Sequence, residues 1–299
     1  MSYRDSKKAV VFGCAGQLGV ELTRVFRERG YDVEGYDRDV VDICDATAVE
    51  AVLARADASL VVNAAAYNMV DIAEHEPAAA FQANALAVRN LAMACRQVDA
   101  QLVHYSTDYV FDGTAGRPYT EQDKPHPLGA YAVSKYAGEL YAEAYLEHPL
   151  IIRTSGVFGP GGLHTARGNF VELVLRLARG SQPIRVVQDH VASPAYAPAL
   201  AERTAQLVER EATGVFHVGG GTPISWFEFA RMIFEAAGVA PELRPTSERE
   251  YRTEARRPKF SALSNAKMEA FGVATMPSME EAVTDYFERR KEHVAAITS

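Results

Sequence analysis

The sequence has few cysteines, a single tryptophan and no long apolar run. Its three cysteines, Cys14, Cys44 and Cys95, are scattered and never spaced as Cys-x-x-Cys. They argue against a disulfide framework or a zinc site and favour a reducing cytoplasm. No stretch approaches the ~20 apolar residues that cross a bilayer, so we expect no membrane association. The short apolar run near the start breaks into glycines, which favours a first strand over a secretion signal.

An excess of positive charge is also absent. The 299 residues carry 31 Lys and Arg against 39 Asp and Glu, a formal net charge of −8, and no basic stripe is present. Nucleic acid is therefore not an expected partner. The eight histidines form no ligand-spaced cluster with cysteine or aspartate, so we expect no metal.

The first half of the sequence alternates between strand-like and helix-like segments. Strand-like runs occupy residues 8–13, 31–37, 58–65, 100–108 and 149–155. Helix-like runs occupy residues 18–30, 46–56, 73–99 and 131–146. This alternation predicts βαβ units, a parallel sheet and therefore an α/β fold.

The alternation of strand-like and helix-like segments is interrupted near residue 156, where a long loop is predicted over 156–169. Further helices are predicted at 170–180, 197–211, 225–238 and 278–291, and strands at 184–190 and 214–220. We expect two interleaved domains. The larger comprises residues 1–155 with about 191–221, and the smaller comprises 156–190 and 222–299.

A glycine-rich turn lies directly between the first predicted strand and helix, with Gly13, Gly16 and Gly19 in the pattern Gly-x-x-Gly-x-x-Gly. Glycine lets the backbone approach a pyrophosphate, and a helix N-terminus supplies free N–H groups with a partial positive charge. The pattern predicts a dinucleotide site that includes Gln17 and Leu18. A plain strand-to-helix turn is the alternative.

An acidic and a basic residue stand together at the end of the second predicted strand. Asp37 lies where a carboxylate would bond a ribose hydroxyl, whereas Arg38 could meet a 2′-phosphate. The two signals conflict, so NAD and NADP both stay open. Asp42 and Ile43 are candidates to flank the adenine, with ordinary loop positions as an equal alternative.

Several segments carry a family resemblance. They are the glycine turn, NAAAYNMVDIAE (63–74), STDYVFDG (106–113), PYTEQDKPHPLGAYAVSKYAGE (118–139) and RTSGVFG (153–159), followed by later segments at 169–170, 225–230 and 256–268. In this order they resemble the dTDP-4-dehydrorhamnose reductases of the extended short-chain dehydrogenase/reductase superfamily. The resemblance implies a doubly wound Rossmann domain that binds NAD(P) and a smaller nucleotide-sugar domain. It also implies NAD(P)H-dependent reduction of a dTDP-linked 4-keto-6-deoxy sugar, foremost dTDP-4-dehydro-L-rhamnose to dTDP-L-rhamnose.

Tyr131 and Lys135 are four residues apart, so on a helix they share one face. The resemblance implies that Tyr131 is the proton donor, Lys135 its helper and Thr107 a hydroxyl partner. A nearby ammonium favours the phenolate and lowers the phenol's pKa from about 10 toward neutrality, which suits acid–base catalysis. An exposed Tyr and Lys on a helix surface is the alternative.

The remaining candidates divide between cofactor and substrate. Cofactor candidates are Asn63, Ala64, Ala65 and Tyr67, together with Tyr131 and with Lys135, which should hold the nicotinamide ribose. Substrate candidates are Val70, Asp108, Tyr109, Gly156, Asn169 and Arg257. Arg257 is interpreted either as a diphosphate contact or as a surface salt bridge. Asn84 is either a backbone contact near the site or a helix-surface amide, and Trp226 is interpreted as the apolar anchor of a helix.

Two departures from the family pattern lie on the substrate side. The family usually has tryptophan where this chain has Gly156, so we expect a wider or more mobile sugar pocket. His190 and Ala195 replace the family's glutamine and threonine. The sugar could therefore be a different keto-sugar or a bulkier one.

Two other functions stay open at this point. Asp108 directly follows Thr107, where dehydratases of the superfamily place an acid, so an epimerase or dehydratase is one alternative. A non-catalytic NADP-binding regulatory subunit, like the β subunit of methionine adenosyltransferase, is the other. Some family members use Mg²⁺ at a dimer interface, but Glu280 and Glu281 are interpreted as a solvated acidic face. A homodimer is compatible with the sequence, which does not fix the oligomeric state.

Overall fold

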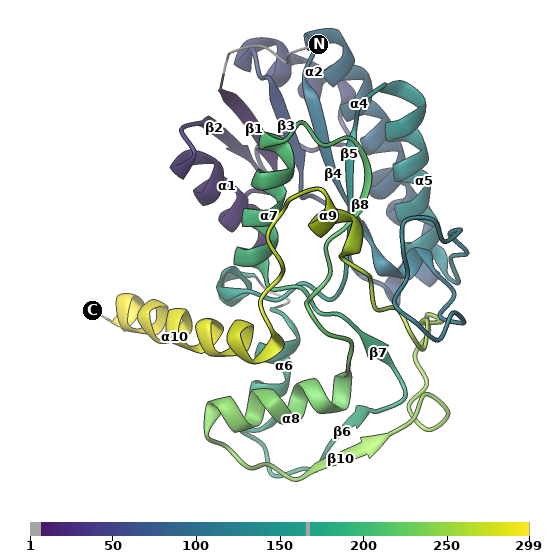
Figure 1. Cartoon of the computed structure of the whole chain (residues 1–299), viewed down its shortest axis with the longest axis vertical. Helices are drawn as coiled ribbons and strands as arrows, with labels where there is room; N and C mark the ends of the chain where they lie inside the picture. Colours follow the sequence, from purple (N-terminus) through teal and green to yellow (C-terminus); the bar gives the residue numbers. More distant parts are fainter. Residues whose placement is uncertain (1–6, 166–167, 299) are drawn as a thin grey trace.

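The computed structural model describes residues 7–165 and 168–298, except for the side chains of His164 and residues 293–298. A six-stranded sheet, ordered β2-β1-β3-β4-β5-β8, forms its centre (Figure 1). The strands are β1 (Lys8–Phe12), β2 (Asp32–Tyr36), β3 (Leu60–Asn63), β4 (Gln101–Thr107), β5 (Leu150–Thr154) and β8 (Gly214–His217). Every neighbouring pair in this sheet is parallel. The predicted α/β fold with a parallel sheet is confirmed.

Helices cover both faces of the sheet. One core contains Ala9 and Val11 of β1 with residues of α1 (Gln17–Glu28) and α7 (Ala197–Glu209). The other core contains Val10 and Phe12 with residues of α2 (Ala46–Ala56), α4 (Ala87–Val98) and α5 (Ala130–Tyr145). Successive strand residues thus serve opposite cores, as strand geometry requires. Burial on both faces explains why β1, β3 and β5 are largely apolar runs, whereas the edge strand β2 is not.

The helix predicted over 73–99 is a composite. A 3₁₀ turn η1 (Ile72–Glu74) precedes α3 (Pro77–Phe81), which continues through a π turn η2 (Gln82–Leu86) into α4. Pro77 takes the first helical position, where its missing N–H costs nothing. The π turn lies against α5 so closely that a Cβ on Gly138 would overlap the carbonyl oxygen of Asn84. Glycine at 138 therefore permits this helix contact.

A second group of elements follows β5 and lies beyond the sheet, at the lower end of the molecule in Figure 1. It contains η4 (Pro160–His164), α6 (Phe170–Leu177), β6 (Ile184–Val187), β7 (Val191–Ala192), β9 (Ile224–Ser225), α8 (Trp226–Ala237), β10 (Leu243–Thr246) and α10 (Met279–Thr298). β6 pairs with β10 in parallel, and β7 pairs with β9 antiparallel. Phe158, Phe229 and Tyr286 lie in its core.

Most predicted elements of the second half are present, with differences in detail. The loop predicted over 156–169 contains η4, and its residues 166–167 lie outside the described part of the chain. The strands β7, β9 and β10 and the short helix α9 (Ala266–Ala270) were not predicted. β10 reads Leu-Arg-Pro-Thr and is short and polar, so its pairing with β6, rather than its own apolar pattern, makes it a strand.

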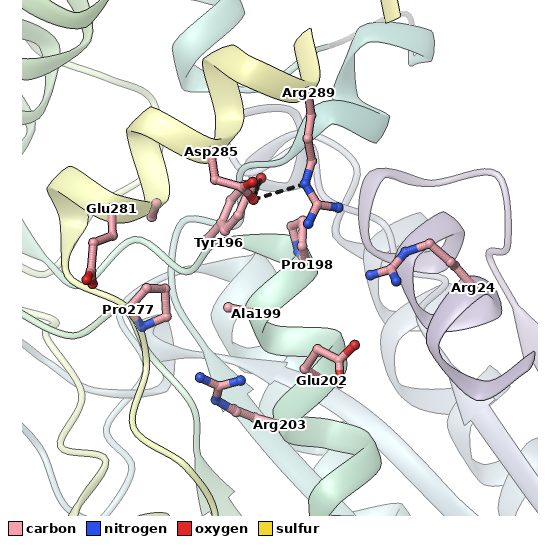
Figure 2. A pocket seen from close by; sticks show the side chains of 11 residues that line it. Arg24, Tyr196, Pro198, Ala199, Glu202, Arg203, Pro277, Glu281, Asp285 and Arg289 are labelled. Carbon is pink, nitrogen blue, oxygen red and sulfur yellow. Dashed lines mark hydrogen bonds and ion pairs between the residues drawn. The ribbon is translucent and has the colours of Figure 1, made fainter. Parts of the chain in front are cut away.

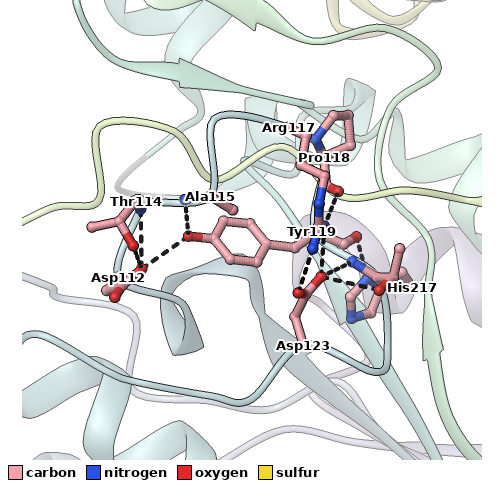
Figure 3. Close-up of polar contacts among 9 residues, drawn as sticks. Asp112, Thr114, Ala115, Arg117, Pro118, Tyr119, Asp123 and His217 are labelled. Atoms are coloured by element: carbon pink, nitrogen blue, oxygen red, sulfur yellow. Dashed lines mark hydrogen bonds and ion pairs between the residues drawn. The ribbon is translucent and has the colours of Figure 1, made fainter.

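The long connection from β4 through η3 (Asp108–Val110) to α5 is fixed by polar contacts (Figure 3). Asp123 accepts two bonds from the Arg117 guanidinium, at 2.7 and 2.8 Å, and these bonds hold the pKa of its carboxyl well below the usual range. The carbonyl of Tyr119 contacts the His217 ring at the end of β8, with 3.0 Å between O and Nδ1. Tyr119 also stacks on Phe111 at 4.1 Å between ring centres. These contacts fix the connection against the end of β8 and so help to position the start of α5 beside the sheet.

Candidate functional site

The glycine turn lies at the switch point of the sheet, where the strand order reverses. β1 has β2 on one side and β3 on the other, and ligands of doubly wound sheets bind in the crevice at this point. Gly13 has φ +77°, and a Cβ there would come within 2.7 Å of the Ala65 nitrogen. A Cβ on Gly19 would overlap the carbonyl oxygen of Gly13. The turn and the predicted cofactor residues Ala64 and Ala65 therefore form one close-packed backbone surface.

The start of α1 connects this turn to the second group of elements. Gly16, the N-cap, has no side chain to occupy the free N–H groups of the first turn. Gln17 donates from Nε2 to the carbonyl of Val157 (2.9 Å) and receives a bond at Oε1 from Asn169 (3.3 Å). Asn169, predicted to bind substrate, also caps α6 through a bond from the Glu172 N–H (3.1 Å). Leu18 packs in the core, so only its backbone can meet a ligand.

The end of β2 brings Asp37 back to the glycine turn. Its Oδ2 accepts a hydrogen bond from the Ala15 N–H at 2.5 Å, while Arg38 is exposed. Asp42 accepts a bond from the Cys44 N–H (2.9 Å), and Ile43 is buried in the core beside α2. Asp37 and Arg38 thus lie at the predicted ribose end, whereas Asp42 and Ile43 already have structural contacts.

Two buried amides fix the segment that follows β3. Asn63 contacts His104 (3.1 Å between Nδ2 and Nδ1) and accepts a bond from the Ala65 N–H at 3.1 Å. Asn84, on the π turn, bonds both the N–H and the carbonyl of Tyr67 at 2.8 and 3.0 Å. It also donates to the Ser134 hydroxyl of α5 at 3.0 Å. Of the two interpretations of Asn84, the structure supports the backbone contact. The Tyr67 phenol itself donates to Glu76 (3.0 Å).

Thr107 and Tyr131 are linked through Tyr109 at the carboxyl edge of the sheet. Thr107 ends β4, and its hydroxyl donates to Asp108 Oδ1 (3.2 Å) and accepts from the Tyr109 N–H (3.2 Å). Tyr131 lies in the first turn of α5, with its ring edge-to-face against Tyr109 at 6.3 Å between centres. Its hydroxyl contacts Asn68 Oδ1 at 3.4 Å. The Thr107 hydroxyl and the Tyr131 ring thus both contact Tyr109 at this edge.

Lys135 lies one turn further along α5 and is 3% exposed. Its ammonium donates to the carbonyl of Tyr105 in β4 at 2.6 Å. Burial lowers the pKa of Lys135 to about 8, and the negative charge of Glu139 opposes that shift. Glu139 is itself buried and ion-paired with Arg153 of β5, at 2.6 Å. The buried carboxylate of Glu139, one helical turn away, therefore partly offsets the effect of burial on Lys135.

Asp108 lies beside Thr107 and is 2% exposed. Its Oδ2 accepts hydrogen bonds from the Ser155 hydroxyl (2.8 Å) and the Ser261 hydroxyl (2.5 Å). Burial raises the pKa of Asp108 to about 6, although these bonds oppose the shift. Asp108 therefore joins β4, β5 and the C-terminal segment, and both of its oxygens are occupied by hydroxyl groups of the protein.

The other substrate candidates lie around Tyr109. Arg257 forms a two-bond ion pair with Asp71, at 2.7 and 3.0 Å, and also interacts with the Tyr109 phenol. Burial raises the pKa of Tyr109 to about 12. Val70 is partly buried in the same segment as Asp71. The structure brings these residues together and gives Arg257 a carboxylate partner.

Gly156 does not leave an open space. Its φ is +42°, and a Cβ there would come within 2.9 Å of Cη2 of the Trp226 indole. Trp226 begins α8 and packs against Phe170 at 4.7 Å between ring centres. A ring from a distant part of the chain therefore fills the space directly beside residue 156, while the width of the sugar pocket stays a prediction. The interpretation of Trp226 as an apolar anchor is correct but incomplete.

Some residues of the site were not predicted. Glu139 had a readable signal, because it continues the spacing of Tyr131 and Lys135 by one more helical turn. Ser261 had none, since it is 153 residues from Asp108 in sequence. His104, Ser134 and Ser155 were also missed.

A separate hollow lies between α1, α7 and α10 (Figure 2) and has a volume of about 350 Å³. None of the predicted site residues lines it. Two of its arginines are already engaged: Arg289 pairs with Asp285 (3.0 Å), and Arg203 donates to the carbonyl of Thr275 (3.1 Å). We assign no ligand to this hollow.

The described part of the chain contains neither a metal-binding cluster nor a membrane-spanning helix. Across 7–165 and 168–298, no group of three or more His, Cys, Asp and Glu could hold a metal ion. Over the same ranges, no helix has the length and apolar character needed to cross a membrane.

Comparison with known proteins gives consistent matches over nearly the whole chain. A family model described as the RmlD substrate binding domain matches residues 7–292. The spore coat polysaccharide biosynthesis protein SpsK of Bacillus subtilis is 36% identical, over 95% of this chain and 98% of its own. A dTDP-4-dehydrorhamnose reductase of Mycobacterium tuberculosis is 37% identical, over 91% of this chain and 89% of its own. The crystal structure of dTDP-4-dehydrorhamnose reductase from Bacillus anthracis with NADP superposes with a TM-score of 0.90, at 34% identity, over 95% of this chain and 99% of its own.

Proposed function

The chain belongs to the family of the RmlD substrate binding domain, and from that premise we propose that it reduces the 4-keto group of a dTDP-linked 6-deoxy sugar with NADPH or NADH. The substrate that we propose first is dTDP-4-dehydro-L-rhamnose, because similar proteins are named for its reduction. The observation that carries the proposal is that Thr107 and Tyr131 both contact Tyr109 at the carboxyl end of β4, while Lys135, one turn along α5, bonds the backbone of the same strand.

The residues of the glycine turn fit a nicotinamide dinucleotide. Glycine at 13 and 19 lets the turn pack directly on the Ala65 backbone and on the start of α1, and the first turn of α1, which has no side-chain cap, offers N–H groups to a pyrophosphate. Asp37, held on the Ala15 N–H, is placed to accept bonds from the adenosine ribose. Lys135 would hold the nicotinamide ribose. The bound cofactor supplies a hydride to the ketone carbon.

The side chains at the carboxyl edge of the sheet would protonate and hydrogen-bond the oxygen of that ketone. Tyr131 gives its phenolic proton to the oxygen as negative charge develops on it. The Thr107 hydroxyl turns from Asp108 to donate a hydrogen bond to the same oxygen, which stabilises the charge in a water-poor site. The Lys135 ammonium favours the phenolate that remains.

The contacts of Asp108 favour reduction over dehydration. A dehydratase needs an acid that can reach the sugar, but the carboxylate of Asp108 is buried and bonded to the hydroxyls of Thr107, Ser155 and Ser261. In this arrangement Asp108 positions Thr107 and is not a proton donor to substrate.

The two parts of the chain would bind different ligands. Residues 1–155 and about 191–221 would bind the cofactor, since α7 and β8 complete the sheet and its helical cover. Residues 156–190 and 222–299 would bind the nucleotide sugar. The three cysteines are free, which supports a cytoplasmic location.

Turnover of dTDP-4-dehydro-L-rhamnose tests the function directly. We expect rapid oxidation of NADPH or NADH, with one dTDP-L-rhamnose formed for each cofactor consumed, and parallel assays will give the cofactor preference. Sugar conversion without net cofactor consumption would instead indicate an epimerase or a dehydratase. Cofactor binding without turnover of this or other dTDP-linked keto-sugars would favour a regulatory role.

The buried Glu139 predicts a shift in the pH profile. Lys135 is charged below its pKa of about 8 and neutral above it, so kcat/KM for reduction is expected to fall as pH rises through about 8. Glu139→Gln removes the charge that holds this pKa up, so the fall is expected about one pH unit lower.

Glu143→Gln is the matched control, because Glu143 lies one turn further along α5 and is exposed. Rate profiles from pH 6 to 10 of the three proteins provide the comparison. An unchanged alkaline limb in Glu139→Gln would show that Glu139 does not set the charge on Lys135.

A further inference from the structure

Trp226 joins the end of a sheet strand to the second group of elements. Gly156 follows β5 by two residues, and β5 pairs with β4 so that Thr154 lies opposite Thr107. Ser155, between them, bonds Asp108, the neighbour of Thr107. The indole that rests on Gly156 therefore lies at the same edge of the sheet as the proposed reacting carbonyl.

Gly156 and Trp226 fit only as a pair. The indole six-membered ring lies so close to the Gly156 backbone that a Cβ would come within 2.9 Å of Cη2 and 3.5 Å of Cζ2. The φ of +42° at Gly156 is also one that residues with a side chain rarely adopt. The indole thus takes up the space that a side chain on residue 156 would fill.

The indole is firmly held. Ser225 caps α8 by accepting a bond from the Glu228 N–H (3.1 Å), and the backbone N–H of Trp226 donates to the carbonyl of His190 (3.2 Å). The ring packs edge-to-face on Phe170 and is 6.2 Å from Phe229 between ring centres. Trp226 nevertheless stays partly exposed. A rigid aromatic surface with one accessible part is suited to contact a ligand at low entropic cost.

We propose that the accessible part of Trp226 forms the wall of the pocket that receives the sugar ring of the substrate, and so helps to select that sugar. The proposal rests on the proposed function. We expect Trp226 to contact the sugar of the substrate rather than its thymine base. The reacting ketone is on the sugar, and the diphosphate separates the sugar from the base. The apolar indole matches the C–H face and the methyl group of a 6-deoxy sugar.

The fluorescence of the protein tests this placement, because Trp226 is the only tryptophan in the chain. The protein is saturated with NADP⁺, whose oxidised ring does not absorb tryptophan emission, and titrated with dTDP-L-rhamnose or with dTDP. We expect the sugar nucleotide to change the emission and dTDP alone to leave it nearly unchanged. Calorimetry on the same samples measures binding independently.

Calorimetric binding of dTDP-L-rhamnose with no emission change beyond that of dTDP would overturn the role of Trp226 and leave the proposed function intact. If the sugar nucleotide does not bind and its keto form is not turned over, the proposed function fails and the inference fails with it.

Variants supply a second readout. Trp226→Phe keeps an aromatic ring in the core but shortens the wall, and we expect KM for the keto-sugar to rise about tenfold with little change in kcat. Gly156→Ala displaces the indole without removing it and should raise the same KM. Phe227→Ala, the neighbouring residue of α8, is the control, and the KM for NADPH should stay constant in all three. An unchanged sugar KM in both Trp226→Phe and Gly156→Ala would overturn the inference.

Discussion

Replacing Tyr131 with phenylalanine is expected to lower kcat about a thousandfold, the range that a positioned general acid contributes. The phenylalanine ring keeps the edge-to-face contact with Tyr109, so the fold and the crevice are retained. Only the hydroxyl that would give its proton to the sugar oxygen is lost. Steady-state assays and an NADPH titration of the same preparation separate the loss of chemistry from any loss of binding.

Tyr136→Phe provides the control for this prediction. Tyr136 is on the same helix and packs against the cluster of Phe111 and Tyr119, so the change removes a phenol of the same kind away from the crevice. Tyr136→Phe should keep near-normal kcat. If Tyr131→Phe retained more than about a tenth of kcat, another group would have to supply the proton.

Replacing Gly19 with alanine is expected to weaken NADPH binding by at least about a hundredfold, because displacement of a binding group by about 1 Å can cost this much. The new Cβ would overlap the carbonyl oxygen of Gly13, and that oxygen also accepts the Gly16 N–H bond that shapes the turn (3.1 Å). The turn must therefore move away from the place where it meets Ala65. Calorimetric titration with NADPH measures the effect.

Val20→Ala is the control for Gly19→Ala, since Val20 is the next residue of α1 and is 40% exposed. Overpacking costs about 1–3 kcal/mol in stability, so Gly19→Ala must also be checked by thermal unfolding. Gly16→Ala offers a milder test, because its Cβ would stay 3.2 Å from the Gly13 oxygen. Normal NADPH affinity in both glycine variants would contradict the proposed cofactor site.

Local sequence signals were sufficient for much of the fold. The helix predicted over 46–56 is α2 with the same bounds, because Asp45 caps it and accepts bonds from the Thr47 and Ala48 N–H groups. The strands β1, β3 and β5 were predictable because burial on both faces demands apolar runs, and the edge strand β2 was predictable from its alternating pattern. The glycine turn was visible because its spacing and its position after β1 are local.

Features that depend on distant contacts were not predictable in the same way. The π turn at Gln82–Leu86 places Asn84 against α5, but nothing in its residues departs from an ordinary helix. Trp226 fits a helix anchor by its own neighbours, and only the approach of Gly156 gives it a second role. The resemblance predicted that residue 156 borders the sugar, but the residue that fills the space there comes from α8.

The bonds of Asp108 also bear on how the protein matures on the ribosome. Domains generally fold from the N-terminus as the chain emerges, so the first strands and the glycine turn can assemble early. Ser261 is synthesised 153 residues after Asp108, and until it arrives the carboxylate beside Thr107 lacks one of its two Oδ2 donors. The neighbourhood of Thr107 is therefore completed only after every strand of the central sheet has been synthesised.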